Sequence, residues 1–317
     1  MLVKLLSLRG PYNKIAMQKY LEKYLLPIAM VIGVAFHQQL AHLSPLIPYL
    51  LALMLFITYS RVSWSDIRLT RFHYILLTIQ YLGSALLYLA LRPFNEILAQ
   101  AAMMCVLTAT ATSAPVVAGM LGGNIASTAA YSIISNLSVA LIAPFFLTAI
   151  GAKEETLSFM AGFWLILKKV LPILVVPFLG ALLLQKTSPK AHRKVQSAQI
   201  LTFYLWAASL TVVLGNVTQF VLMHNDGSYR LELLIAATSL LICLLQFIGG
   251  RAIGARYGRT VAGGQGLGQK NTILAIWLTQ TYLNPLATLG PGLYVLWQNL
   301  VNSWQIWNKM RQTKKSA

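Results

Sequence analysis

Long runs of apolar residues with almost no charge constrain this chain more than any other feature. Leu25 to Phe36, Leu46 to Tyr59 and Leu231 to Ile248 are three examples. A helix that crosses a bilayer needs roughly 20 mostly apolar residues. Charged residues make up 10% of the 317 residues, whereas soluble domains carry about 25%. Charge this sparse cannot cover a globular surface in water, so the sequence predicts a polytopic integral membrane protein.

The apolar runs divide the chain into about ten predicted transmembrane helices. Continuous runs favour helices, because the strands of a transmembrane barrel alternate apolar and polar residues in short segments. We therefore expect an all-α membrane protein with a basic arm at 1–24, five-helix repeats at 25–150 and 156–308, and a basic tail at 309–317. The predicted spans are residues 25–40, 44–60, 72–92, 95–118, 123–150, 164–185, 198–222, 231–252, 261–283 and 287–308.

The positive charge is distributed unevenly between the loops. If the N-terminus is cytoplasmic, 19 of the 25 Lys and Arg residues fall in predicted cytoplasmic segments, while Arg92, Lys153 and Arg230 fall on the opposite side. Cytoplasmic loops of membrane proteins carry such an excess. We expect insertion in the plasma (inner) membrane with both termini cytoplasmic. The formal charge of +18 then reflects topology, and we expect no nucleic-acid partner.

Two of the predicted spans differ from ordinary lipid-facing helices. The fourth contains Thr108 to Pro115, which is rich in hydroxyls, and the ninth contains Gly263 to Asn271, which is rich in glycine and amides. Glycine and proline destabilise a helix interior. Each stretch is in the fourth of five spans in its half. Five is odd, so the halves have inverted topology, and matched breaks in such halves are typical of secondary transporters. Kinks for close packing are the alternative.

Several short stretches match, in order and spacing, the sequence motifs of one known protein family. Thr108 to Pro115 falls where a known pattern has Cys-Pro-Gly-Gly-Thr-Ala-Ser-Asn, and Gly123 to Thr128 is similar to a Gly-Asn/Asp-Val-Ala-Leu-Ser helix start. Pro291 to Asn299 resembles Pro-Gly…Trp-His-Asn, and the ninth-span break resembles Glu-x-Gly-x-Gln-Asn. The chain thus resembles the bile acid:sodium symporter family, as a divergent bacterial-type member. The resemblance implies two inverted five-helix repeats, broken and crossing helices 4 and 9, and alternating access.

The resemblance also implies sodium sites, and the sequence departs from the family at several ligands. Gly266 occupies the position of the family's glutamate that two sodium sites share, and Lys270 occupies the position of a family glutamine. Ala114 and Pro115 occupy the positions of the family's Ser-Asn pair in the fourth helix. None of the seven acidic residues lies in the middle of a predicted span. We therefore expect sodium coupling to be altered or lost, and no other cofactor or metal. Three polar residues remain at positions that resemble sodium ligands: Gln80, Thr128 and Ser132.

Lys270 is the cation that we place deepest in the membrane, near the second helix break. A charged side chain at the bilayer centre costs roughly 3 kcal/mol or more and by default marks function. Its ammonium would occupy the space that a sodium ion fills in relatives, held by freed carbonyls and by side chains such as Gln80, Thr128 and Asn271. Three roles are open: proton coupling by titration, pairing with an anionic substrate, and pinning two helices without moving.

These features predict a secondary transporter of a small organic anion. The alternatives are a sodium-coupled symporter with a neutral-ligand site and a non-transporting membrane sensor or scaffold on this fold. We expect no enzyme, because no paired carboxylates, Cys/His pair or metal-ligand cluster lies within a span. The predicted contacts with substrate or ion are Lys270, Asn271, Gln269, Thr112, Ser113, Gln80, Thr128, Ser132 and Asn299, and the predicted break residues are Pro115, Gly266 and Gly268.

Overall fold

The computed structural model describes residues 28–60, 68–151, 158–224 and 229–316. The predicted basic arm at 1–24 lies outside these residues. The described part of the chain consists of helices and their connections, with no strand beyond a single isolated pair of bridged residues. The predicted all-α class is therefore confirmed.

Four helices of the described residues are long and apolar enough to cross a membrane. They are α4 (Arg71–Leu91), α7 (Ile125–Gly151), α8 (Phe159–Thr187) and α11 (Arg230–Ala255). The chain is thus a helical membrane protein, as the apolar runs predicted.

The remaining helices cover the other apolar runs. Every predicted span falls on one helix or on two consecutive helices, the first on helical residues 28–35 together with α2. The further elements are α2 (His37–Ala41), η2 (Ser44–Leu46), α3 (Ile47–Tyr59), α5 (Glu96–Leu107), α6 (Ala114–Met120), α9 (Pro189–Ser197), α10 (Gln199–His224), α12 (Thr260–Gly268), α13 (Thr272–Tyr282), η4 (Pro285–Thr288) and α14 (Leu289–Ser316).

Local capping residues fix where several of these helices begin. The first N–H groups of a helix lack partners within the helix, and Asn, Ser and Thr side chains supply them. The Asn95 side chain accepts a hydrogen bond from Leu98 N at 2.9 Å and starts α5. Ser158 caps α8 in the same way. Thr70 and His73 form a reciprocal capping pair at the start of α4.

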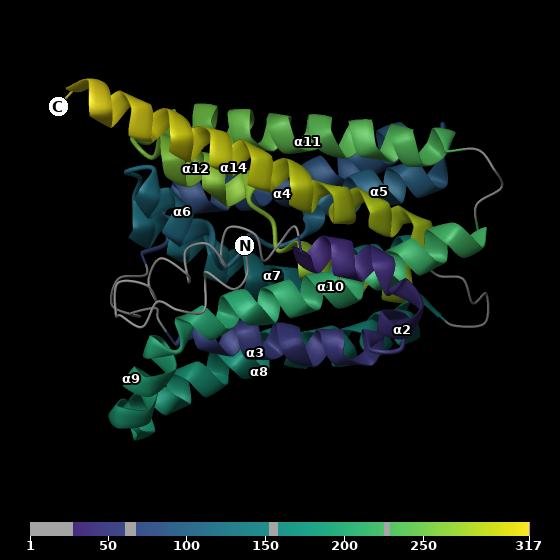
Figure 1. Cartoon of the computed structure of the whole chain (residues 1–317), viewed down its shortest axis with the longest axis horizontal. Coiled ribbons are helices and arrows are strands. Elements are labelled where there is room, and N and C mark those ends of the chain that lie inside the picture. The colour runs from purple at the N-terminus through teal and green to yellow at the C-terminus, as the bar shows by residue number, and fades with distance from the viewer. Residues whose placement is uncertain (1–27, 61–67, 152–157, 225–228, 317) are drawn as a thin grey trace, which may run out of the picture.

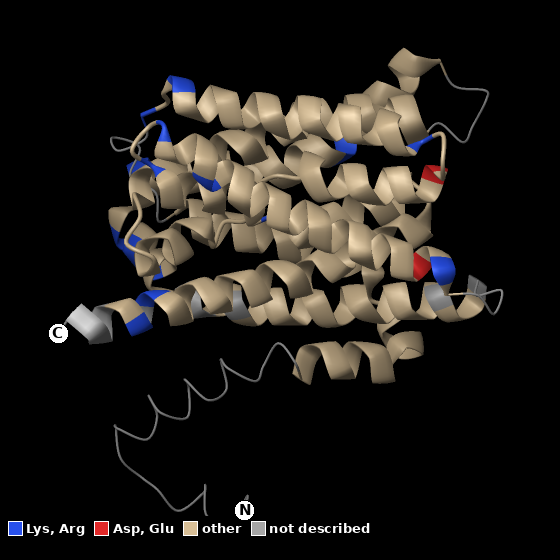
Figure 2. Ribbon diagram, turned by 90° about the horizontal axis from the view of Figure 1, so that it is seen from above, with Lys and Arg blue, Asp and Glu red and all other residues tan. Residues whose placement is uncertain are grey.

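The helices lie side by side along one direction (Figure 1). In that view α4, α5, α11, α12 and α14 occupy the upper part, and α2, α3, α8 and α10 occupy the lower part. Most Lys and Arg residues gather at the end of the bundle where the C-terminus lies (Figure 2). We call this end the basic end.

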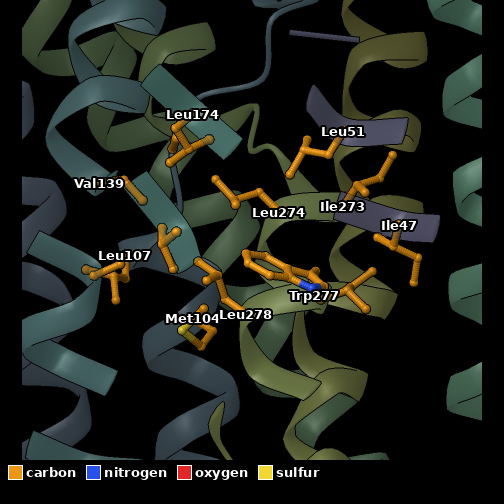
Figure 3. Close-up of a cluster of buried hydrophobic side chains, with 14 of the residues drawn as sticks. Ile47, Leu51, Met104, Leu107, Val139, Leu174, Ile273, Leu274, Trp277 and Leu278 are labelled. Atoms are coloured by element: carbon orange, nitrogen blue, oxygen red, sulfur yellow. The ribbon is translucent and has the colours of Figure 1, made fainter. Parts of the chain in front are cut away.

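Helix α13 lies at the centre of the largest apolar cluster. Residues 272–279 of this helix are all buried, and a helix that is hydrophobic all round belongs in an interior. Its side chains meet those of four other helices (Figure 3). The cluster shown contains Leu51 from α3, Met104 and Leu107 from α5, Val139 from α7, Leu174 from α8, and Ile273, Leu274, Trp277 and Leu278 from α13. The part of α13 that follows the second break is therefore enclosed in the interior.

The two helix breaks are shorter than the sequence suggested. Between α5 and α6 the non-helical segment is 108–113, and Pro115 lies in the first turn of α6. Proline fits there because its missing N–H would have no partner in any case. Between α12 and α13 the non-helical segment is 269–271. Gly266 lies inside α12 and Gly268 is its last residue, so these glycines are not the unwound part of the chain.

Candidate functional site

The two helix breaks lie against each other in the interior. Ala111 N donates to Gln269 O at 2.8 Å, and Asn271 N donates to Ala109 O at 2.7 Å. These bonds flank an antiparallel bridge between Thr110 and Lys270. Non-helical backbone at membrane depth is tolerated only where protein buries it or a cavity hydrates it. Here each break satisfies part of the backbone of the other.

The C-terminal end of α5 is satisfied by side chains from four places in the chain. The last four carbonyl groups of a helix have no partner within the helix, and a buried carbonyl without a partner is costly. In α5 each of the four accepts a side-chain hydrogen bond. The donors are Thr108 Oγ1 for Met104 (2.5 Å), Gln246 Nε2 for Cys105 (3.0 Å), Lys270 Nζ for Val106 (2.8 Å) and Gln80 Nε2 for Leu107 (2.7 Å).

Lys270 is 1% exposed, and its ammonium faces the end of α5. Besides Val106 O, Nζ donates to Thr108 O at 3.1 Å. The C-terminus of a helix carries a partial negative charge that favours a cation. Within the described residues, the single ion pair is Arg92 with Glu96, so no carboxylate compensates this lysine. Carbonyl oxygens and the α5 dipole favour the charged form of its side chain instead.

Gln80 lies beside Lys270 and is fully engaged. Its Nε2 donates to Leu107 O and, at 3.2 Å, to Thr108 O. Its Oε1 accepts from Tyr131 OH at 2.9 Å and from Ser135 Oγ at 3.0 Å. The carbonyl oxygen of an amide has two lone pairs, so Oε1 has no capacity left for a metal ion in this conformation.

Helix α7 holds the first break through one polar face. Asn136 Nδ2 donates to Thr110 O at 2.9 Å, and Ser135 Oγ accepts from Thr110 N at 3.2 Å. Ser132 Oγ lies 3.4 Å from Thr110 O and 3.3 Å from Ala111 O. Thr128, one turn earlier, instead donates to Asn124 O in its own helix. Of these predicted ligands, the structure brings Gln80 and Ser132 to the breaks and directs the Thr128 hydroxyl elsewhere.

A cavity of about 270 Å³ opens beside the two breaks. Its polar wall consists of the breaks and α14, and its mainly apolar wall consists of α3, α6 and α10, which also bring the hydroxyls of Thr58 and Thr202. The polar wall includes the predicted residues Thr112, Ser113, Gln269, Lys270, Asn271 and Asn299, together with Gln298. The apolar wall includes Leu51, Met54, Leu55 and Trp206. A ligand that fits this cavity has one polar end and one apolar face.

The polar side chains of the cavity differ in how firmly they are held. Gln269 Nε2 donates to Ser113 Oγ at 2.8 Å and so joins the two breaks. Its Oε1 is buried and has no hydrogen-bond partner among the described residues. Asn271 Oδ1 accepts from Leu274 N at 3.3 Å and caps α13. Asn299 donates to Val295 O in its own helix, whereas Gln298 accepts from Lys270 N at 2.8 Å.

The sequence did not single out Ser135, Asn136 or Gln246 as parts of the site. One signal was available for α7, because Ser132, Ser135 and Asn136 are spaced as neighbours on one helix face within an otherwise apolar run. No comparable signal marks Gln246, or Trp206 in the apolar wall. Among the described residues no group of three or more His, Cys, Asp or Glu side chains could hold a metal ion.

Comparison of the sequence with models of known protein families finds no match, and neither does comparison with curated proteins. What the site does is therefore inferred from its geometry and from the sequence patterns described above.

Proposed function

We propose that this protein is a secondary transporter of a small organic anion. Ten spans would form two inverted five-helix repeats similar to those of the bile acid:sodium symporter family. One observation carries the proposal: the two helix breaks, one from each half of the chain, pair with each other at the polar wall of a cavity. Discontinuous helices that meet at an interior cavity are typical of secondary transporters.

The walls of the cavity support an amphipathic anion as substrate. The positive N-terminus of α13 starts at the cavity, next to the polar side chains of Gln269 and Asn271. A helix N-terminus favours a negative group. In the same cavity, Leu55 and Trp206 offer an apolar surface. Ligand sites usually measure about 300–1,000 Å³, so a cavity of about 270 Å³ suits a small organic acid.

We further propose that transport does not require sodium. In this arrangement the Lys270 ammonium already places a cation against the carbonyls of Val106 and Thr108, and Gln80 Oε1 is used by two hydroxyl donors. The sequence left three roles open for Lys270. A fixed cation here supports one of them, that of pinning two helices without moving. It also removes the space in which a sodium ion would bind.

The test is a thermal-shift screen of the purified full-length protein against small organic acids. Each acid is added in sodium chloride and in choline chloride of equal ionic strength. We expect at least one acid to raise the Tm equally in both salts and to be taken up by liposomes that contain the protein. Stabilisation only in sodium would favour the sodium-coupled alternative, and the absence of both stabilisation and uptake would favour a sensor or scaffold.

A matched pair of variants then locates the ligand. Thr112→Val removes a hydroxyl from the polar wall of the cavity with little change in size. Thr78→Val makes the same change on the exposed side of α4. We expect Thr112→Val to reduce the ligand-induced Tm shift, with a loss in affinity of about 1 kcal/mol. We expect Thr78→Val to bind as the wild-type protein does, and equal binding by both variants would contradict the proposed cavity.

A further inference from the structure

A second and larger cavity, of about 670 Å³, has the basic residues Arg251 and Lys309 in its lining. It is formed by α11 and α14, with Leu121 from the end of α6 and Val261 from the start of α12. Nothing in the proposed transport mechanism uses this cavity. It is separate from the cavity at the helix breaks, because the two have no lining residue in common.

The lining of this cavity combines two cations with exposed apolar side chains. Arg251 comes from α11 and Lys309 from the last third of α14. Arg251 Nη1 donates to Gln305 Oε1 at 3.0 Å, which engages one of the five N–H groups of the guanidinium. The apolar part includes Ile248, Leu300 and Trp304, which are 63%, 62% and 61% exposed. In a membrane protein these side chains face the acyl chains of lipids.

We propose that this cavity is a binding site for an anionic glycerophospholipid, which is recognised by its phosphate group. Basic pockets between transmembrane helices bind the headgroups of anionic lipids, and guanidinium groups bind phosphate through paired N–H donors. The apolar residues next to the cations favour a lipid over a soluble phosphate, because one lipid molecule places its phosphate at the cations and its acyl chain against Ile248 and Leu300. The phosphate sits between Arg251 and Lys309, and an acyl chain lies along Leu300 and Trp304.

The position of this site connects it to the helix breaks. Leu121 directly follows α6, the helix after the first break, and Val261 is the second residue of α12, the helix before the second break. The Lys309 side chain also lies at the turn after α6, where a Cβ placed on Gly122 would be 3.8 Å from Nζ. A lipid in this cavity therefore contacts the outer ends of both half-helices that approach the interior breaks.

The proposal is tested by native mass spectrometry of the purified, delipidated full-length protein. Phosphatidylglycerol and phosphatidylcholine with identical acyl chains are titrated in turn. The test variant is Arg251→Gln/Lys309→Gln. The matched control, Lys190→Gln/Arg193→Gln, removes the same charge from exposed positions of α9 at the same end of the bundle. Tm and gel filtration establish that each variant is folded. The single variant Lys309→Gln is added because it changes only an exposed side chain and so leaves the fold intact.

We expect the wild-type protein and the control variant to retain phosphatidylglycerol in preference to phosphatidylcholine. The test variant should retain on the order of tenfold less phosphatidylglycerol, because each Lys or Arg beside an anionic headgroup adds to the attraction. The single variant Lys309→Gln should show a smaller loss of phosphatidylglycerol, because it keeps Arg251. Equal retention by the test and control variants would overturn the proposal. So would equal retention of the two lipids by the wild-type protein, or complete displacement of phosphatidylglycerol by millimolar inorganic phosphate. Because no transport is measured, failure here is distinguishable from failure of the proposed function.

Discussion

Lys270 illustrates how a single buried charge is accommodated inside this bundle. An ammonium in a medium of low polarity is unfavourable unless hydrogen bonds and opposite charge compensate it. The carbonyl groups of Val106, in the last turn of α5, and of Thr108, just after it, supply that compensation, because the helix end lacks partners and carries the negative end of the helix dipole. The lysine and the helix end satisfy each other, so neither can be changed alone without cost.

Replacement of this ammonium by an apolar group of similar length tests that dependence. Lys270→Met would leave Val106 O without a partner, while Thr108 O keeps its bond from Gln80. We expect a loss of about 1–3 kcal/mol, the cost of one unsatisfied buried group, seen as a lower Tm in detergent. The control is Lys190→Met on the exposed side of α9, which should leave the Tm unchanged. Equal Tm values for the two variants would show that the α5 carbonyls do not depend on Lys270.

At the scale of elements, helix α12 owes its position to glycine contacts with α11. A Cβ placed on Gly250 would lie 2.2 Å from Gly263 O, and one on Gly263 would lie 2.1 Å from Gly250 O. Gly268 has a related role, since a Cβ there would lie 2.4 Å from the Phe247 ring. The glycines of the ninth span therefore allow two helices to approach closely. The sequence alone suggested unwinding, because glycine is found both where a helix unwinds, owing to its low helix propensity, and where two helices approach closely, and only the neighbouring helix distinguishes the two cases.

Two adjacent glycines of α11 provide a matched test of this packing. Gly250→Ala would force α11 away from α12, and we expect a loss of about 1–3 kcal/mol from overpacking. Gly249→Ala adds the same methyl group where no atom lies within 4 Å. Its effect should lie between zero and a gain of about 1 kcal/mol, because alanine favours a helix more than glycine does. Tm measurements on both variants decide the matter, and a Gly250→Ala protein as stable as Gly249→Ala would contradict close contact at this position.

At the scale of the whole molecule, the positive charge is distributed unevenly between the two ends of the bundle. Lys and Arg residues concentrate at the end of the bundle where the C-terminus lies, and few occur at the other end (Figure 2). The cytoplasmic side of membrane proteins carries such an excess. We infer that the basic end is cytoplasmic and that the turn between α4 and α5 faces the opposite side.

Labelling of introduced cysteines in intact cells tests this orientation. Phe94→Cys lies in the turn between α4 and α5, where the native side chain is 82% exposed. Arg193→Cys lies on the exposed side of α9 at the basic end. We expect a membrane-impermeant maleimide to label Phe94→Cys directly and Arg193→Cys only after permeabilisation. The native Cys105 and Cys243 are buried, so the wild-type protein should give a low background, and the reverse pattern would invert the proposed topology.

The sequence by itself determined the membrane class, the helical character of the apolar runs and the presence of two breaks, because apolar length and helix-breaking residues are local properties. It also placed Lys270, Gln269 and Asn271 together, since they are consecutive. Only the tertiary structure decided what they meet. Lys270 and Val106 are 164 positions apart, and the mainly apolar wall comes from α3, α6 and α10. Partners so distant are selected by helix packing and by the need of buried carbonyls for donors, neither of which a single stretch of sequence contains.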